Sequence, residues 1–260
     1  MTTPALLLDA VRRSFGTRPA LDGLSLKVDA GEVVAMIGLN GAGKTTALRV
    51  LTGRLRPASG TARVLQRDPA RLDVATARRV GNVVGAPLVD PALTVAENLR
   101  AAALLNGVPR AQVTAAGAAA VGRLDLAAWA GARARDLSAG NAQRLGVACA
   151  TVHDPAALVL DEPTSALDPR GVVLVRELVR ERARAGAAVL VSSHHLDEVA
   201  RVADRVAVVH AGRVVGELDP RGADIERRFF AMVLAADTPG SGPDAPAGAA
   251  GRAPRGRRAA

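Results

Sequence analysis

Gly38-Leu39-Asn40-Gly41-Ala42-Gly43-Lys44-Thr45 has the GxxxxGK[ST] spacing of a phosphate-binding loop. Glycines in such a loop let successive backbone N–H groups point at a polyphosphate, because no Cβ obstructs the approach. We expect Lys44 to reach the β- and γ-phosphates, and the Thr45 hydroxyl to ligate Mg²⁺. The apolar run Val33–Ile37 predicts a buried parallel strand before the loop. The sequence therefore predicts a nucleotide-binding protein, whose phosphate contacts are Gly38, Asn40, Gly41, Ala42, Gly43, Lys44, Thr45 and Thr46.

A second apolar run, Leu158-Val159-Leu160-Asp161-Glu162, ends in two carboxylates. A strand with this ending is typical of the Walker B motif, in which Asp161 would hold Mg²⁺ and Glu162 would accept a proton from water. Adjacent strand residues point to opposite sides, so both acids serve one site only if the strand ends there, as Pro163 favours. The alternative is a solvated strand end, which the phosphate loop upstream disfavours.

Further segments follow in an order that resembles the ATP-binding cassette (ABC) ATPases, and the resemblance covers about residues 5 to 220. Asp161 to Pro169 resembles the Walker B motif and D-loop of that family. The remaining matches are Leu137-Ser138-Ala139-Gly140-Asn141 for the signature LSGGQ, Ser192-Ser193-His194 for the switch histidine, Phe15 for the aromatic that stacks on adenine, and Leu93 to Asn98 for the segment after the Q-loop.

The resemblance implies an α/β fold: a P-loop NTPase core with a mostly parallel sheet, a small antiparallel β subdomain and an inserted α-helical subdomain. We expect an ATPase domain over residues 1–236, with the helical subdomain at about 86–155. Ala- and Leu-rich stretches predict helices within it at 95–105 and 112–124. Residues 237–260 are rich in Pro, Gly, Ala and Arg and predict a disordered tail.

The resemblance also implies roles for individual residues. Glu162 and His194 would be catalytic, Glu162 by activating water and His194 by holding the γ-phosphate. The cofactors would be ATP and Mg²⁺, with Thr45 and Asp161 on the metal. Ser138, Gly140 and Asp168 would also bind nucleotide, the first two across a dimer of ATPase subunits.

Two of these assignments keep an alternative at the level of the residues. Phe15 is one of three phenylalanines in a chain without tyrosine, which favours a stacking platform, and core packing is the alternative. His195 competes with His194 for the place after the apolar strand. His153 and His210 lack such a context, and we expect both on the surface.

Three positions depart from the family pattern. Ala139 replaces a glycine and Asn141 a glutamine of the signature. A methyl group at Ala139 restricts the backbone angles, so we expect weaker ATP-driven pairing. Gly85 stands where a Gln or Glu normally contacts Mg²⁺ and senses the membrane partner. Either Asn82 or Asp90 substitutes for that side chain, or the contact is absent.

Composition restricts the partners and the location. The net charge is +9, but no aromatic-rich basic segment accompanies it, so no nucleic acid is expected. Arg176, Arg180, Arg182 and Arg184 are expected on the solvated face of a helix. The longest uncharged run, residues 111–122, has 12 residues, and a membrane-spanning helix needs about 20. Cys149 is the only cysteine and is expected to be buried in a helix.

The sequence thus predicts the ATP-hydrolysing subunit of an ABC transporter, active as a homodimer or with a similar subunit. It would be cytoplasmic, peripheral on the cytoplasmic face of the cell membrane, and bound to separate integral membrane subunits. Export is favoured over import, because the chain resembles bacterial drug and antibiotic exporter ATPases, and because the residues after 220 leave no room for an importer's regulatory domain. The alternatives are a soluble ABC ATPase acting on ribosomes or nucleic acid, and a non-catalytic regulatory cassette.

Overall fold

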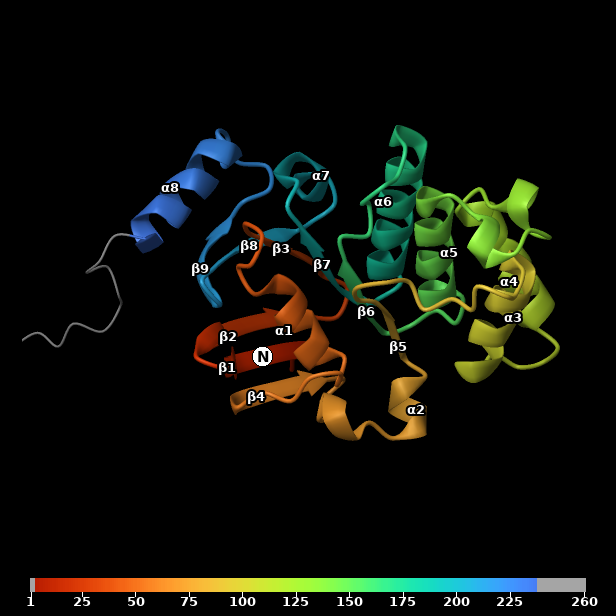
Figure 1. The fold of residues 1–260 in the computed structure, drawn as a ribbon, viewed down its shortest axis with the longest axis horizontal. Helices are drawn as coiled ribbons and strands as arrows, with labels where there is room; N and C mark the ends of the chain where they lie inside the picture. The colour runs from red at the N-terminus through yellow and green to blue at the C-terminus, as the bar shows by residue number, and fades with distance from the viewer. Residues whose placement is uncertain (1–2, 238–260) are drawn as a thin grey trace, which may run out of the picture.

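The computed structural model describes residues 3–237, which form two sheets surrounded by helices (Figure 1). The larger sheet has six strands in the order β5-β6-β7-β3-β8-β9, and all neighbours are parallel except β8 and β9. Every residue of β3, β6 and β7 is buried, as continuous apolar runs covered on both faces require. The strands are β3 (Val33–Ile37), β5 (Val80–Val83), β6 (Ala157–Asp161), β7 (Ala188–Ser193), β8 (Arg205–His210) and β9 (Arg213–Leu218).

The smaller sheet is antiparallel, in the order β2-β1-β4. Its strands are β1 (Leu6–Phe15), β2 (Arg18–Val28) and β4 (Ser59–Val64). Helix α1 (Lys44–Leu51) lies between the two sheets, and its apolar residues share one core with both. This packing holds the start of α1 at the carboxyl edge of β3.

Three helices lie between β5 and β6 in the chain and form the right-hand part of the molecule in Figure 1. They are α3 (Val95–Leu105), α4 (Val113–Arg123) and α5 (Ala139–Thr151), joined by the short η2 (Ala127–Trp129) and η3 (Ala134–Asp136). The stretches 95–105 and 112–124 are therefore helical, as the sequence indicates. These helices share a core with α6 (Pro169–Arg184) and with one face of β6 and β7. Cys149 is buried in α5, as predicted, and burial raises the pKa of its thiol to about 12.

The remaining elements are η1 (Pro69–Arg71), α2 (Val74–Ala77), α7 (Leu196–Ala200) and α8 (Ile225–Asp237). Helix α8 packs on β8 and β9 through Phe229 and Val233. The tail predicted at 237–260 lies outside the described residues, except for Asp237, which ends α8. Within residues 3–237, no helix combines the length and the apolar character that a membrane span requires.

Three predictions of surface positions are wrong, those for Arg182, His153 and His210. Arg182 is 6% exposed, and its guanidinium contacts Asp154 and donates to Glu181 at 2.8 Å. His153 is half-buried and both its ring nitrogens are shielded from solvent, so burial lowers the pKa of its imidazole. Neighbouring elements of the fold bury both residues, and residue type alone does not predict that burial. His210 is also half-buried, with Nε2 2.7 Å from the Asp237 carboxylate.

Candidate functional site

The phosphate loop connects the buried end of β3 to the first residue of α1. Gly43 has a φ of 109°, and a Cβ on it would lie 2.5 Å from the Ala20 carbonyl oxygen. A Cβ on Gly38 would lie 2.2 Å from the carbonyl oxygen of Val209. Both glycines are therefore required by the packing of the loop against β2 and β8, and the cradle that they form has no room for side chains.

Lys44 is buried at the start of α1. Its Nζ donates to the carbonyl oxygens of Gly38 at 2.6 Å and Leu39 at 3.3 Å, so the ammonium lies over the loop. Burial lowers the pKa of Lys44, whereas the charges of Glu162 and Asp161 raise it. The lysine of the first motif and the acids of the second therefore face one site. They meet because parallel strands bring their carboxyl ends to the same edge of a sheet.

Asp161 ends β6 and is 8% exposed, and its Oδ1 accepts a hydrogen bond of 2.6 Å from the Ser192 hydroxyl. Glu162 has a left-handed φ of 48°, and its N–H donates to the carbonyl and hydroxyl oxygens of Ser192 at 3.1 Å. The chain thus leaves the strand direction at Glu162, which is how two adjacent acids can serve one site. Sequence reasoning did not assign a role to Ser192, although a hydroxyl in an apolar buried strand is a signal for it.

His194 follows β7 and lies against Glu162, with its Nδ1 2.8 Å from Oε2 of the carboxylate. His195 does not make this contact. It precedes α7 and lines a recess with Phe229 and Phe230, and its ring centroid is 3.9 Å from that of His194. The geometry therefore favours His194 over His195 as the histidine of the site.

Phe15 ends β1 and is 51% exposed, so the alternative that it packs in the core is wrong. The Arg13 guanidinium lies 5.5 Å from the centroid of its ring. Phe15 pairs with Arg18 across the β1–β2 hairpin, and Arg18 extends to within 4.0 Å of the position that a Cβ on Gly41 would occupy. The exposed ring is thus held on a hairpin beside the phosphate loop, where a base can stack on it.

The signature and D-loop segments pack on each other. A Cβ on Gly140 would lie 2.7 Å from the Ala166 carbonyl oxygen. Ser138 caps α5 by accepting a hydrogen bond from the Asn141 N–H at 3.2 Å, and Asp168 caps α6 by accepting from Gly171 at 2.8 Å. In the described part of the chain, neither side chain hydrogen-bonds to the phosphate loop or to Asp161.

The backbone at Ala139 does not require the conformational freedom of glycine. Ala139 is the first residue of α5 and has no positive φ, so a glycine is not needed there. Asn141 is buried, and its side-chain oxygen accepts a hydrogen bond from Arg144.

Gly85 is exposed with a φ of 74°, and no atom lies within 4 Å of the position of a Cβ. The two candidates to replace its side chain are engaged elsewhere. Asn82 accepts from Arg54 at 3.0 Å, and Asp90 accepts from the Ala92 N–H at 2.9 Å. Arg54 also donates to the Val84 carbonyl oxygen at 2.7 Å, so this arginine, which sequence reasoning missed, supports the segment before Gly85.

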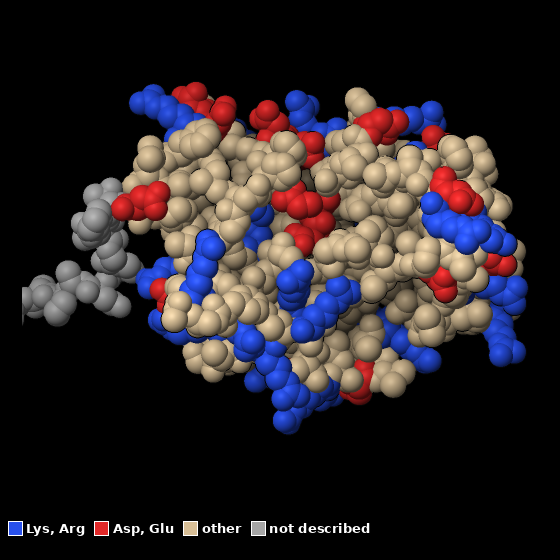
Figure 2. Space-filling model, in the orientation of Figure 1, with Lys and Arg blue, Asp and Glu red and all other residues tan. Residues whose placement is uncertain are grey.

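The residues present fit a magnesium nucleotide. The site combines a glycine cradle, a buried ammonium and the half-buried hydroxyls of Thr45 and Thr46 at a helix start, opposite a buried carboxylate. Figure 2 shows acidic side chains gathered at the centre of the front face. Within residues 3–237, no three His, Cys, Asp or Glu side chains form a metal site by themselves. Mg²⁺ would therefore be held by Thr45, Asp161 and the phosphates together.

Comparisons with known proteins agree with this geometry. The family model described as "ABC transporter" matches residues 21–165. The chain is 38% identical over 221 residues to the Nod factor export ATP-binding protein I of Paraburkholderia xenovorans, covering 85% of this chain and 72% of that protein. It is 37% identical over 217 residues to the daunorubicin resistance ATP-binding protein DrrA3 of Streptomyces coeruleorubidus, covering 84% and 69%.

An import protein is equally similar. The methionine import ATP-binding protein MetN of Caulobacter vibrioides is 41% identical over 226 residues, covering 82% of this chain and 68% of that protein. Among solved structures, an ATP-binding subunit of an ABC transporter superposes with a TM-score of 0.78 at 28% identity, covering 89% of this chain and 95% of that one.

Proposed function

The chain belongs to the ABC transporter family as an ATP-binding ATPase subunit, and from this premise we propose how its own residues bind and hydrolyse ATP. The observation that carries the proposal is the convergence of Lys44, Asp161, Glu162 and His194 at one edge of the sheet. Asp161, Glu162 and His194 come from the ends of the neighbouring strands β6 and β7, and Lys44 begins α1 directly after the adjacent β3, so the parallel sheet brings them to one edge.

When bound, MgATP supplies the phosphoanhydride bond and a divalent charge on its phosphate oxygens. The loop N–H groups and Lys44 hold the β- and γ-phosphates, and Thr45 and Asp161 hold the metal. Glu162 accepts a proton from the attacking water. His194 orients the Glu162 carboxylate through Nδ1, which leaves Nε2 as the ring atom to contact the γ-phosphate.

A second ATPase subunit completes each site in this proposal. Ser138 is exposed at the start of α5, where it can reach the γ-phosphate held by the other subunit, together with Gly140, and Asp168 also binds nucleotide. Phe15 stacks on the adenine of its own subunit's nucleotide. The second subunit is a further copy of this chain or a similar ATPase.

The ATPase domain would span residues 1–236, with the helical subdomain at about 86–155, and would bind integral membrane subunits on the cytoplasmic face of the membrane. Export is the direction that we propose, since two of the three relatives described above are named for export or drug resistance. The similarity to MetN, which is named for import, is the finding that speaks against export.

The test is to tag the protein in its native cells, solubilise the membranes in mild detergent and identify what co-purifies in fixed ratio. We expect a protein with several membrane spans whose presence raises ATP turnover. Recovery only in the soluble fraction, on ribosomes or on nucleic acid, would contradict the transporter assignment. Direction is then measured with the complex in vesicles, by asking which side loses substrate when ATP is added outside.

A further inference from the structure

The net positive charge of the described chain is confined to one stretch. Residues 49–79 hold eight arginines and two aspartates, whereas the other described residues hold 22 basic and 22 acidic side chains. The stretch runs from α1 through β4, η1 and α2, and Figure 2 shows blue side chains along the lower edge of the molecule, where these elements lie. We call this surface the arginine face: Arg49, Arg54, Arg56, Arg63, Arg67, Arg71, Arg78 and Arg79.

The arginine face carries more charge than its carboxylates offset: apart from the charge interaction between Arg67 and Asp73, its arginines have no acidic partner among the described residues. All eight arginines are exposed, and none forms an ion pair within residues 3–237. Seven arginines elsewhere do, including Arg182, Arg205 and Arg213. The two aspartates of the stretch are engaged as helix caps, Asp68 with the Ala70 N–H at 2.9 Å and Asp73 with the Thr76 N–H at 2.7 Å. This uncompensated charge attracts an anionic partner.

Three of the arginines line a groove of about 300 Å³ between β4 and η1. Arg56, Arg63 and Arg71 line it together with Asp68, whose carboxylate accepts from the Ala70 N–H, and no described carboxylate forms an ion pair with any of the three arginines. Guanidinium groups bind phosphate oxygens through paired N–H donors, so the groove has the size and the chemistry for a phosphate head group.

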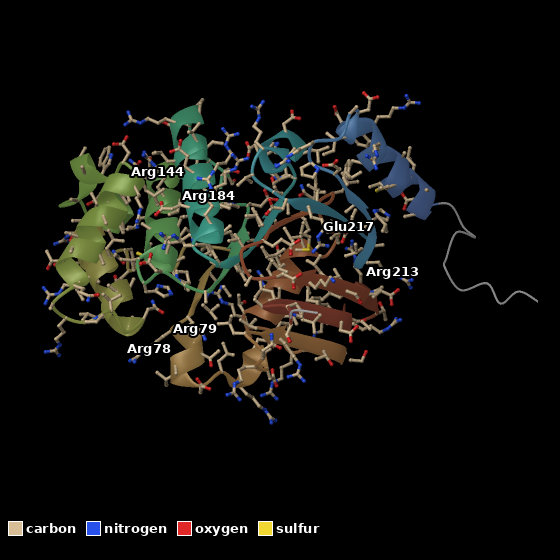
Figure 3. The ribbon with its side chains drawn as sticks, turned by 180° about the vertical axis from the view of Figure 1, so that it is seen from behind. Arg78, Arg79, Arg144, Arg184, Arg213 and Glu217 are labelled. Carbon is tan, nitrogen blue, oxygen red and sulfur yellow. The ribbon has the colours of Figure 1, made fainter. Side chains whose placement is uncertain are left out.

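The arginine face continues into exposed leucines. Arg78 packs against the turn after α3, because a Cβ on Gly107 would lie 2.8 Å from its Cδ. Figure 3 labels Arg78 and Arg79 beside α2, at the lower edge of the molecule. Leu105, at the end of α3, is 77% exposed, and Leu88 is 65% exposed. Both leucines line a second groove, separate from the one that Arg56, Arg63 and Arg71 line. Arginines next to exposed leucines suit the boundary between lipid head groups and acyl chains.

We propose that the arginine face binds the phosphate groups of anionic lipids. Single-stranded nucleic acid is disfavoured, because residues 49–79 contain no Phe, Trp or Tyr on which a base could stack, and a DNA duplex is an outcome of the test below. The inference rests on the proposed function, which brings the ATPase subunit to a membrane. The lipid contact would then orient the ATPase subunit on the membrane before and during docking.

The test is co-sedimentation of the full-length protein with vesicles of phosphatidylglycerol and phosphatidylcholine in equal parts, and with phosphatidylcholine alone. The variant is Arg56→Gln/Arg63→Gln/Arg71→Gln. The matched control is Arg110→Gln/Arg184→Gln/Arg221→Gln, which removes the same charge from exposed arginines that form no described ion pair outside the face. Both proteins keep the same residues 238–260, so any contribution of that segment cancels.

We expect the wild type and the control to bind the vesicles that contain phosphatidylglycerol and not those of phosphatidylcholine alone. Added salt should release both proteins. The groove variant should partition about a hundredfold less, since each basic residue near such a surface contributes roughly fivefold. Equal loss in both triple variants, or no binding by the wild type, would overturn the inference. So would tighter binding to a DNA duplex through the same three arginines.

Two further measurements keep the test decisive. If thermal unfolding shows that the triple variant is not folded, the single variants Arg56→Gln, Arg63→Gln and Arg71→Gln replace it, each with about a fivefold expected loss. ATP turnover is measured on every protein without vesicles. If the wild type hydrolyses ATP normally but does not bind anionic vesicles, the lipid site is refuted and the proposed function is not. If the wild type binds the vesicles but does not hydrolyse ATP, the proposed function is refuted and the lipid site is not.

Discussion

At the scale of single residues, the site depends on charges that the sheet edge brings together. Lys44 is buried, and its ammonium donates hydrogen bonds to backbone carbonyl oxygens. The nearby carboxylates partly offset the free-energy cost of burying this charge. Asp161 and Glu162 differ in environment. Asp161 is buried and accepts a hydrogen bond from Ser192, whereas Glu162 is half-buried and contacts His194. This difference suits Asp161 to a metal and Glu162 to proton transfer.

Glu162→Gln should leave ATP binding intact and lower turnover by about a hundredfold or more, because an amide cannot accept the proton of the attacking water. ATP binding and single-turnover hydrolysis check this. Glu177→Gln, at an exposed position of α6, is the matched control and should behave as wild type. Turnover near the wild-type rate in Glu162→Gln would exclude that residue as the base.

Lys44→Ala should abolish ATP binding, because the only buried cation beside the described phosphate loop is removed. Equilibrium binding of a fluorescent ATP analogue measures the loss. Lys27→Ala, at the exposed surface of β2, removes the other lysine of the chain and should bind normally. Retained affinity in Lys44→Ala would mean that the loop N–H groups suffice.

Ala139→Gly tests whether the departure from the signature pattern limits pairing. Because Ala139 already has helical backbone angles, we expect ATP-driven dimerisation to change by less than about threefold, despite the extra flexibility of glycine at a helix start. Sedimentation of the Glu162→Gln background with ATP provides the readout. A large gain in the dimer fraction would show that Ala139 weakens ATP-driven pairing, as expected from the sequence.

At the scale of elements, the caps decide where the helices begin. Thr94 and Glu97 form a reciprocal capping box at the start of α3, with hydrogen bonds of 3.2 and 2.8 Å. The caps of α6, α5 and α2 are one-way: the side chains of Asp168, Ser138 and Asp73 each accept one hydrogen bond from the backbone N–H three residues later. Two of these caps, Ser138 and Asp168, belong to motifs with a proposed nucleotide role, so the same side chains begin a helix and are candidates for nucleotide contact.

Thr94→Ala should lower the free energy of unfolding by about 1 kcal/mol, because the N–H of Glu97 loses its partner at the start of α3. Urea unfolding followed by circular dichroism measures the change. Thr94→Ser retains the hydroxyl and should lose much less. An equal loss in both variants would show that the methyl group of Thr94, rather than the cap, carries the effect.

At the scale of the whole molecule, ion pairs connect the two sheets. Asp22 on β2 accepts hydrogen bonds from Arg213 on β9, one of them 3.0 Å long, and also contacts Arg12. The hydrogen bonds and the charge of Arg213 hold the pKa of Asp22 below its usual value. The lowered pKa in the folded state means that this carboxylate stabilises the fold above the unfolded pKa of about 3.9, and that the contribution is lost as pH falls through the folded pKa.

Asp22→Asn should therefore be less stable than wild type at neutral pH, and the difference should shrink as pH falls below about 4. Thermal unfolding across pH checks the sign. Asp9→Asn, at an exposed carboxylate of β1 without a described ion pair, is the control and should show no such convergence. A constant difference at every pH would show that the hydrogen-bond geometry matters rather than the charge.

Much of the fold follows from local patterns. Continuous apolar runs predict β3 and β6 because a strand covered on both faces needs no polar alternation. Strand β4 was missed, since Ser59-Gly60-Thr61-Ala62-Arg63-Val64 has only two buried side chains and gains its order from pairing with β1. Pairing partners distant in the chain cannot be seen in a six-residue window.

The sequence by itself determined the nucleotide motifs, since a glycine cradle followed by Lys44 and a strand ending in Asp161 are local requirements of phosphate and metal binding. Other features depend on tertiary contacts: His194 rather than His195 contacts Glu162, Phe15 is exposed, Arg182 is buried, and the arginines of residues 49–79, which form no described ion pair, lie on one face (Figure 2). The physical reason is that contact, burial and charge balance depend on which segments the sheets bring together, and those segments lie far apart in the chain.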